Sequence, residues 1–325
     1  MFIHVVLLIV GLVVLYFGAE WLVAGASRIA LTFGISPMII GLTIVAFATS
    51  APEFVVSLLA TLNGNPDIAM GNVIGSNIAN VALIVGASCL VFPMVVERSV
   101  LRRDYPIMVV AMAIATVFAM TSQQINRYEA LFLLSLLGGF LWLCLREAVS
   151  QSRQYRATGQ FQIGQAAPKR IAKNAARAVA GLIGLVIGAQ LMVDNAVAIA
   201  RMFDISELVI GVTIVAFGTS LPELATSLVA AFRKEPDMSL GNIIGSNIFN
   251  TTFILGGVSL VAPIQASSQA VRFDLPAAML IGLLLFPLMR MGNRISRVDA
   301  AVLLGAYVSY VVLSVLYSTG VWGAA

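Results

Sequence analysis

The chain has 325 residues, of which 60% are hydrophobic and only 10% are charged. An ordinary soluble domain carries about 25% charged residues, so this composition excludes a soluble globular fold and predicts a membrane protein. The formal net charge of +4 does not indicate binding to nucleic acid, because the basic residues lie in short segments between apolar stretches.

Apolar stretches of about 20 residues or more predict transmembrane helices, and ten follow one another along the chain. They are 2–32, 37–62, 69–93, 101–121, 128–147, 172–202, 207–232, 239–262, 271–290 and 298–320. The one long polar segment, 148–170, separates five predicted helices from five. We therefore expect a first five-helix repeat at 1–147, a basic linker at 148–170 and a second repeat at 171–325.

Two sequence motifs each occur twice, at one constant offset. GLTIVAFATSAPE at 41–53 matches GVTIVAFGTSLPE at 211–223, and GNVIGSNIAN at 71–80 matches GNIIGSNIFN at 241–250. Both pairs lie 170 residues apart, within the regions of about 37–93 and 207–262. Self-similarity at a fixed period is the signature of a duplicated structural unit.

The basic residues predict the orientation in the membrane. If the N-terminus lies outside, only Arg127, Arg201 and Arg272 of the 19 lysines and arginines fall on the outer side. The expected location is the inner (plasma) membrane of the cell. The positive-inside rule then places both termini outside and the linker 148–170 in the cytoplasm. Because five helices per copy is an odd number, the second copy enters the membrane from the opposite side. The predicted fold is an all-α membrane protein whose ten transmembrane helices form two inverted-topology five-helix repeats.

The first motif brings oxygen ligands to one helix face. Pro52 lacks an amide hydrogen and clashes with the carbonyl four residues earlier, so the helix is predicted to break just before it. Backbone groups freed in a membrane need protein or a watery cavity to satisfy them. Positions 46, 49, 50 and 53 share one helix face, and this face offers hard oxygen donors that suit Ca²⁺ or Na⁺. The donors are the Ala46 carbonyl, the hydroxyls of Thr49 and Ser50, and the carboxylate of Glu53.

The second motif and the second copy extend this set. Ser76 and Asn80 are four residues apart and share a face. The equivalent residues of the second copy are Ala216, Thr219, Ser220, Glu223, Ser246 and Asn250. If the copies face each other, both carboxylates converge near the bilayer midplane, where their charge of −2 matches one Ca²⁺, two Na⁺ or two protons. Two alternatives stay open: the hydroxyls can bond back to helix carbonyls, and the glycines of the second motif can serve helix packing.

Other charged residues are less informative. Glu20 and Asp194 have no charged counterpart in the other copy. Each is expected to line an ion path, to pair locally or to snorkel towards the membrane surface. The Arg102/Asp104 and Arg272/Asp274 pairs are interpreted as interfacial anchors. Cys89 and Cys144 lie in apolar stretches, so no disulfide is expected, and His4 is expected to be uninvolved.

At these motifs the chain resembles the cation/Ca²⁺ exchanger superfamily, in particular the prokaryotic Na⁺/Ca²⁺ exchanger-like proteins. The resemblance implies ten helices with long oblique first and sixth helices, no cofactor, and ion ligands at the twelve positions named above. Relatives often carry Asp at one or both of the positions that match Asn80 and Asn250. This chain has Asn at both, which leaves two carboxylates in the site.

The expected function is antiport of Ca²⁺ against Na⁺ by alternating access, in a lipid bilayer, with no nucleic acid and no obligate protein partner. The alternative on the same fold exchanges Ca²⁺ or another cation for H⁺, with the glutamates carrying protons. A passive cation channel is disfavoured by the inverted duplication. An intramembrane hydrolase that uses Ser76 or Ser246 is disfavoured because no His or Lys base occupies a matching position.

Overall fold

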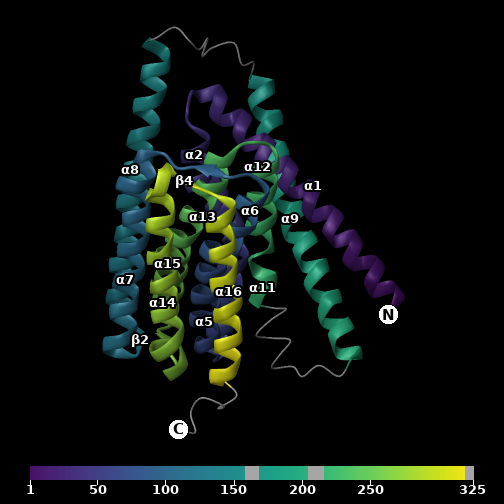
Figure 1. The fold of residues 1–325 in the computed structure, drawn as a ribbon, viewed down its shortest axis with the longest axis vertical. Helices are drawn as coiled ribbons and strands as arrows, with labels where there is room; N and C mark the ends of the chain where they lie inside the picture. Colours follow the sequence, from purple (N-terminus) through teal and green to yellow (C-terminus); the bar gives the residue numbers. More distant parts are fainter. Residues whose placement is uncertain (158–167, 204–215, 319–325) are drawn as a thin grey trace. The chain divides into compact units, whose positions relative to one another are not determined.

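The structure of the protein, a computed structural model, is described for residues 1–157, 168–203 and 216–318 (Figure 1). Nine helical segments in these residues are long and apolar enough to span a membrane. The predicted span 207–232 lies partly outside the described residues, and its described part includes the helix α12, Leu221–Phe232. The other predicted spans all correspond to helical segments, and the prediction of an all-helical membrane protein is confirmed.

The chain divides into two compact units that cut across the two sequence repeats. Unit 1 comprises Met1–Pro52 and Leu141–Asn242, and unit 2 comprises Glu53–Phe140 and Ile243–Ala325. Each unit therefore contains helices from both copies of the duplicated sequence.

Unit 1 is built on two long helices that cross at glycines. Its described elements are α1 (Phe2–Phe33), α2 (Pro37–Ile40), η1 (Gly41–Val45), α3 (Ala46–Thr49), the end of α8 (Arg127–Ala157), α9 (Pro168–Met202), α11 (Ala216–Thr219), α12 (Leu221–Phe232) and the start of α13 (Pro236–Phe249). A Cβ on Gly18 would lie 2.6 Å from the Leu185 nitrogen, and one on Gly181 would lie 2.4 Å from the Leu22 nitrogen. Only glycine permits this backbone contact between α1 and α9, as at many membrane helix crossings.

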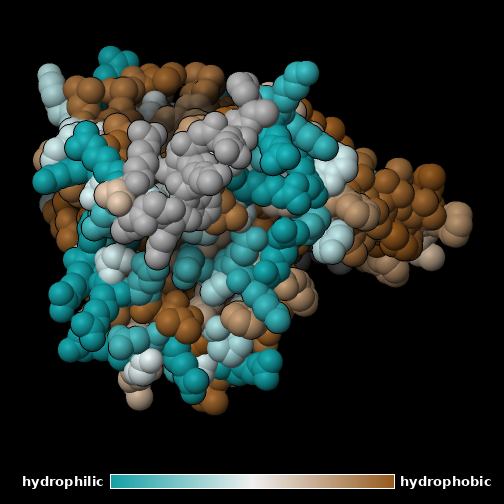
Figure 2. All heavy atoms as spheres, turned by 90° about the horizontal axis from the view of Figure 1, so that it is seen from above, coloured by the Kyte–Doolittle hydropathy of each residue, from teal (hydrophilic) through white to brown (hydrophobic). Residues whose placement is uncertain are grey.

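The outer face of α1 is suited to lipid. Ile9, Val13 and Phe17 are each about half exposed, and hydrophobic residues cover the surface at the right of Figure 2. The opposite face of α1 packs against α9 and α12, with Leu15, Leu22 and other apolar residues in a buried cluster. In a bilayer, apolar exposure of this kind is the expected surface rather than a liability.

Unit 2 contains the second motif of each copy. Its described elements are α4 (Ala51–Leu62, from Glu53), α5 (Pro66–Ile78), η2 (Ala79–Ile84), α6 (Val85–Val91), β1 (Met94–Val95), η3 (Val100–Asp104), α7 (Tyr105–Ser122), β2 (Gln124–Ile125), α8 to Phe140, α13 from Ile243, η5 (Asn250–Ile254), α14 (Leu255–Val261), β3 (Ile264–Gln265), η6 (Ala270–Asp274), α15 (Leu275–Arg290), η7 (Met291–Asn293), β4 (Arg294–Ile295) and α16 (Arg297–Ser318). The spans Pro66–Val91 and Pro236–Val261 are the most buried, at 78% and 83%. Within unit 2, α5 contacts both α14 and α15.

Two short antiparallel ladders close opposite ends of unit 2. β1 pairs with β4, with Met94 opposite Ile295, and β2 pairs with β3, with Ile125 opposite Ile264. The two ladders occupy equivalent positions in the two copies, and Figure 1 shows β4 and β2 at opposite ends of the helices. Each ladder joins a loop of one copy to a loop of the other.

Candidate cation-binding site

A helix break places a serine at the centre of the first motif in each copy. α3 gives way to α4 at Ser50, whose φ and ψ are −81° and 0°, and α11 gives way to α12 at Ser220, with −87° and 4°. These angles lie in the bridge region between helix and strand. The break predicted from Pro52 is confirmed, and Pro222 follows the same break in the second copy.

In unit 1 the break residues of one copy contact the carboxylate of the other. Ser50 Oγ donates a hydrogen bond to Glu223 Oε1 at 3.1 Å, and Glu223 is fully buried. Thr49 Oγ1 lies 3.3 Å from the Ala46 carbonyl oxygen and 3.2 Å from Asn242 Oδ1. The Thr49 hydroxyl therefore bonds back to a carbonyl of its own helix, which is one of the two alternatives expected from the sequence. The Ser50 hydroxyl instead donates to the carboxylate of Glu223.

Two serine–asparagine pairs, whose serines are fully buried, support these positions and were missed from the sequence. Asn242 Nδ2 donates to Ser227 Oγ at 3.1 Å, and Asn72 Nδ2 donates to Ser57 Oγ at 3.0 Å. Asn72 Nδ2 also lies 3.3 Å from the Glu53 carbonyl oxygen. The sequence did contain a signal for these residues. Asn72 and Asn242, like Ser57 and Ser227, are 170 residues apart, and each serine follows the glutamate of its motif by one helical turn.

In unit 2 the asparagines of the second motif lie in widened helical turns. Asn80 lies within the π-helical turn η2, and Asn250 is the first residue of the π-helical turn η5. The backbone carbonyl of each asparagine accepts a hydrogen bond from the backbone N–H five residues later, that of Val85 or of Leu255. Such π-turns are often found at functional sites. Both side chains are fully buried, and their amide nitrogen and oxygen have no hydrogen-bond partner among the described residues. Buried polar atoms without partners are costly, so these amides fit a site that binds a ligand.

Contacts within unit 2 also join the two copies. Asn77 Nδ2 donates to Thr251 Oγ1 at 3.0 Å, and the ring of Phe54 stacks on that of Phe253 with centroids 4.8 Å apart. Phe54 follows Glu53 directly, and Phe253 lies one turn after Asn250. Glu53 itself is fully buried.

The twelve predicted ligands are distributed over both units, and each unit holds residues from both copies. Unit 1 holds Ala46, Thr49, Ser50, Ala216, Thr219, Ser220 and Glu223, and unit 2 holds Glu53, Ser76, Asn80, Ser246 and Asn250. Because the two glutamates belong to different units, their convergence stays a prediction. In the described part of the chain, no three His, Cys, Asp or Glu side chains cluster as a metal site. Ten of the twelve predicted ligands are neutral oxygen donors.

The charged residues that break the symmetry have local partners. Arg233 Nη1 donates to Glu20 Oε1 at 2.5 Å, and Gln190 Nε2 donates to Asp194 Oδ1 at 2.8 Å. The structure therefore shows a hydrogen-bond partner for each of these two carboxylates. His4 Nδ1 lies 2.9 Å from Asn195 Oδ1.

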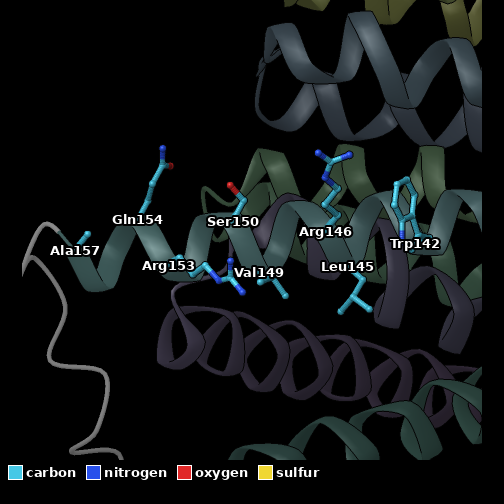
Figure 3. Close-up of a pocket in the computed structure, with 8 residues that line it drawn as sticks. All are labelled: Trp142, Leu145, Arg146, Val149, Ser150, Arg153, Gln154 and Ala157. Atoms are coloured by element: carbon cyan, nitrogen blue, oxygen red, sulfur yellow. The ribbon is translucent and has the colours of Figure 1, made fainter.

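A surface hollow of about 680 Å³ lies on the last turns of α8, and none of the twelve candidate ligands lines it (Figure 3). It is lined by Trp142, Leu145, Arg146, Val149, Ser150, Arg153, Gln154 and Ala157. Arg146 lies over the Trp142 ring at 5.6 Å, an arrangement typical of a helix end at a membrane interface.

A duplicated, all-helical membrane protein with carboxylates buried in its spans belongs to the class of secondary transporters. The comparisons with known proteins specify the family. The pattern of the sodium/calcium exchanger protein family matches the chain twice, at residues 3–146 and 173–316. Both bounds of the second match lie 170 residues after those of the first, which is the offset of the motifs.

Relatives cover nearly the whole chain. CaxA of Alkalimonas amylolytica is 40% identical over 318 residues, which are 95% of this chain and 98% of that protein. The inner membrane protein YrbG of Escherichia coli is 38% identical over 284 residues, 86% of either chain. A solved structure of the sodium-calcium exchanger NCX_Mj, soaked with 10 mM Na⁺ and zero Ca²⁺, superposes with a TM-score of 0.81 at 32% identity. The match covers 95% of this chain and 98% of that one.

The chain therefore belongs to the sodium/calcium exchanger family. It has the fold of a cation exchanger, and its family is one of transporters rather than of enzymes.

Proposed function

We propose that the protein exchanges Ca²⁺ for Na⁺ across the inner membrane by alternating access, with the twelve predicted residues as ligands. One observation carries the proposal: Glu53 and Glu223 are fully buried, Glu53 in a segment long enough to span the membrane and Glu223 in the apolar helix α12. The units that hold them take polar oxygens from both copies. On insertion scales a charged side chain at the membrane centre costs about 2.5–3.5 kcal/mol. A bound cation would offset that cost.

The chemistry of the donors supports these ions. Carboxylate, hydroxyl, amide and carbonyl oxygens are hard ligands, and Ca²⁺ accepts six to eight of them in flexible geometry. A charge of −2 is balanced by one Ca²⁺ or by two Na⁺, so the two ions can replace each other at the same residues. Competition for one site, opened alternately to either side, is the basis of antiport.

The relatives support the same pairing and location. NCX_Mj is named as a sodium-calcium exchanger, and YrbG is named as an inner membrane protein. With the positive-inside rule, this favours termini outside and a cytoplasmic linker.

The test uses the purified chain in liposomes loaded with Na⁺, with ⁴⁵Ca²⁺ outside. Uptake that requires internal Na⁺ is expected. Uptake driven by a proton gradient without Na⁺ would instead favour exchange against H⁺, which the same two glutamates could support. Ca²⁺ flux without any counter-ion would indicate a channel.

The glutamates are tested separately. Glu53→Gln and Glu223→Gln preserve side-chain shape but remove the charge, and each is expected to lower Na⁺-dependent uptake at least 100-fold while the protein stays folded. Glu97→Gln changes an exposed carboxylate outside the set and should leave uptake unchanged. Normal transport by either site variant would show that the ligand assignment is wrong.

A further inference from the structure

A pocket of about 490 Å³ at one end of unit 2 gathers three arginines. It is lined by Arg98, Leu101, Arg102, Phe286, Arg290 and Asn293. None of these is among the twelve candidate cation ligands. A site rich in guanidinium groups suits an anion rather than the transported cations.

The pocket is built by two loops that the β1–β4 ladder holds together. Val95 pairs with Arg294, and the Val96 nitrogen donates to the Asn293 carbonyl oxygen at 2.8 Å. Asn293 has a φ of 50°, which turns the chain at the end of α15. On the apolar side, the Phe286 ring stacks on Tyr105 with centroids 5.8 Å apart. The walls are therefore fixed by backbone pairing and ring packing.

No carboxylate in the described part of the chain pairs with the three pocket arginines. Arg98, Arg102 and Arg290 form no ion pair or hydrogen bond with any residue that the structure describes. The sequence suggested that Arg102 pairs with Asp104, but Arg103 holds this carboxylate, with Nε at 2.7 Å from Oδ1. The nearby Glu97 accepts a hydrogen bond from Ser99 and does not line the pocket.

The duplication supplies an internal comparison at the other end of unit 2. The β2–β3 ladder has the same construction: the Ala266 nitrogen donates to the Gln123 carbonyl oxygen at 2.8 Å, and Gln123 has a φ of 52°. There, Ser268, Arg272 and Met120 occupy the positions equivalent to the three pocket arginines. The loop geometry forms with one arginine, so the fold does not require the other two.

We propose that this pocket binds the headgroup of one anionic phospholipid of the cytoplasmic leaflet. The guanidinium groups of Arg98, Arg102 and Arg290 contact the phosphate oxygens, which arginine binds with charge-assisted, often bidentate hydrogen bonds. Leu101 and Phe286 contact the glycerol and upper acyl region. The positive-inside orientation places the β1–β4 end in the cytoplasmic leaflet, whose anionic lipids attract basic side chains near the membrane surface.

The test is native mass spectrometry of the full chain, purified in mild detergent and titrated with phosphatidylglycerol or phosphatidylcholine. The wild-type protein should retain one phosphatidylglycerol in preference to phosphatidylcholine. Each of Arg98→Gln, Arg102→Gln and Arg290→Gln should weaken this binding roughly fivefold, and the triple variant about 100-fold. These side chains are exposed, so the variants should fold, and the single changes carry the test if the triple does not.

A charge-matched control removes three exposed basic residues of α9, outside the pocket: Lys169→Gln, Arg170→Gln and Lys173→Gln. It should retain phosphatidylglycerol as the wild type does. Equal loss in the control and the pocket variant would overturn the proposal, because it would show a general charge effect. Equal binding of phosphatidylcholine, or displacement of phosphatidylglycerol by millimolar inorganic phosphate, would overturn it as well, the latter by identifying a site for the free anion.

Discussion

Asn80 and Asn250 occupy equivalent positions where a carboxylate would change the charge of the proposed site. Each amide is fully buried, and neither its nitrogen nor its oxygen has a partner among the described residues. As neutral ligands they supply one oxygen each and leave the site charge at −2. The two glutamates balance one Ca²⁺ as well as two Na⁺. A further carboxylate at position 80 or 250 would change that balance, so these two positions are expected to tune ion preference.

Asn80→Asp should favour Ca²⁺ over Na⁺, because Coulomb attraction to an added negative charge grows with the charge of the ion. We expect the KM for Ca²⁺ to fall about tenfold relative to the Na⁺ concentration that half-inhibits uptake, a change that corresponds to about 1.4 kcal/mol. Initial rates of ⁴⁵Ca²⁺ uptake over both ion concentrations measure this ratio. Asn63→Asp makes the same change at an exposed position after α4 and should leave the ratio unaltered. An unchanged ratio in Asn80→Asp would remove this residue from the site.

Between elements, serine–asparagine pairs tie each broken helix to the helix that follows it. Asn242 contacts both Ser227 and Thr49, so it links α12 and α13 to the break in the other copy. Within the first copy, Asn72 on α5 donates to the Ser57 hydroxyl and to the Glu53 carbonyl oxygen, both on α4. These serines and asparagines are not among the candidate ligands, and their hydrogen bonds fix the helices that carry the ligands.

Ser227→Ala should destabilise the protein, because it leaves the buried Asn242 amide without one partner. An unsatisfied buried donor costs about 1–3 kcal/mol, towards the lower end within membrane proteins. The free energy of unfolding in detergent measures the effect. Ser135→Ala on the exposed face of α8, where the hydroxyl donates to the Phe132 carbonyl one turn earlier, is the matched control and should change the free energy of unfolding little. Equal stability of the two variants would contradict a holding role for this pair.

The crossing of α1 and α9 makes a second prediction about elements. In Gly181→Ala the new Cβ would lie 2.4 Å from the Leu22 nitrogen, so the helices must separate, and overpacking of this kind costs about 1–3 kcal/mol. In Gly138→Ala on α8, no described atom lies within 4 Å of the new Cβ, and better helix propensity should be neutral to slightly stabilising. Thermal unfolding in detergent should therefore separate the two variants, and equal melting temperatures would show that the crossing adapts freely.

The elements differ in how far the sequence predicts them. The break before Pro52 was predictable because proline acts on its own helix within four residues. The π-turns at Asn80 and Asn250 were not, since no residue type marks such a turn. The contact between Thr49 and Asn242 joins residues 193 apart, and a single sequence contains no signal for that pairing. Face and spacing could therefore select the candidate ligands, but not the residues that hold them.

On the scale of the whole molecule, the duplication predicted the fold but not its packing units. The repeats run consecutively along the sequence, whereas both compact units combine segments from both copies. The cause lies in the close contacts between copies: a Cβ on Gly41 would lie 2.6 Å from the Met238 carbonyl oxygen, and one on Gly241 would lie 2.6 Å from that of Met38. Such backbone contact can form only after both copies are present. The two copies are therefore expected to fold together rather than as independent domains.

The orientation in the membrane is testable because the native cysteines are buried. Cys89 and Cys144 are 0% and 1% exposed, so a membrane-impermeant maleimide should label introduced cysteines above a low background. Ser122→Cys, exposed beside β2, should react in intact cells, because that end is expected outside. Ser99→Cys, exposed before η3, should react only after the membrane is permeabilised.

Complete labelling of both variants in permeabilised cells is the control, since it shows that each thiol is reachable. The reverse pattern in intact cells would place the termini and the β2–β3 ladder inside. The arginine pocket would then lie in the outer leaflet, where the bias of basic residues towards the cytoplasm could not explain it. The interpretation of the basic residues and the lipid proposal therefore both depend on the predicted orientation. This labelling experiment tests that orientation without any measurement of transport.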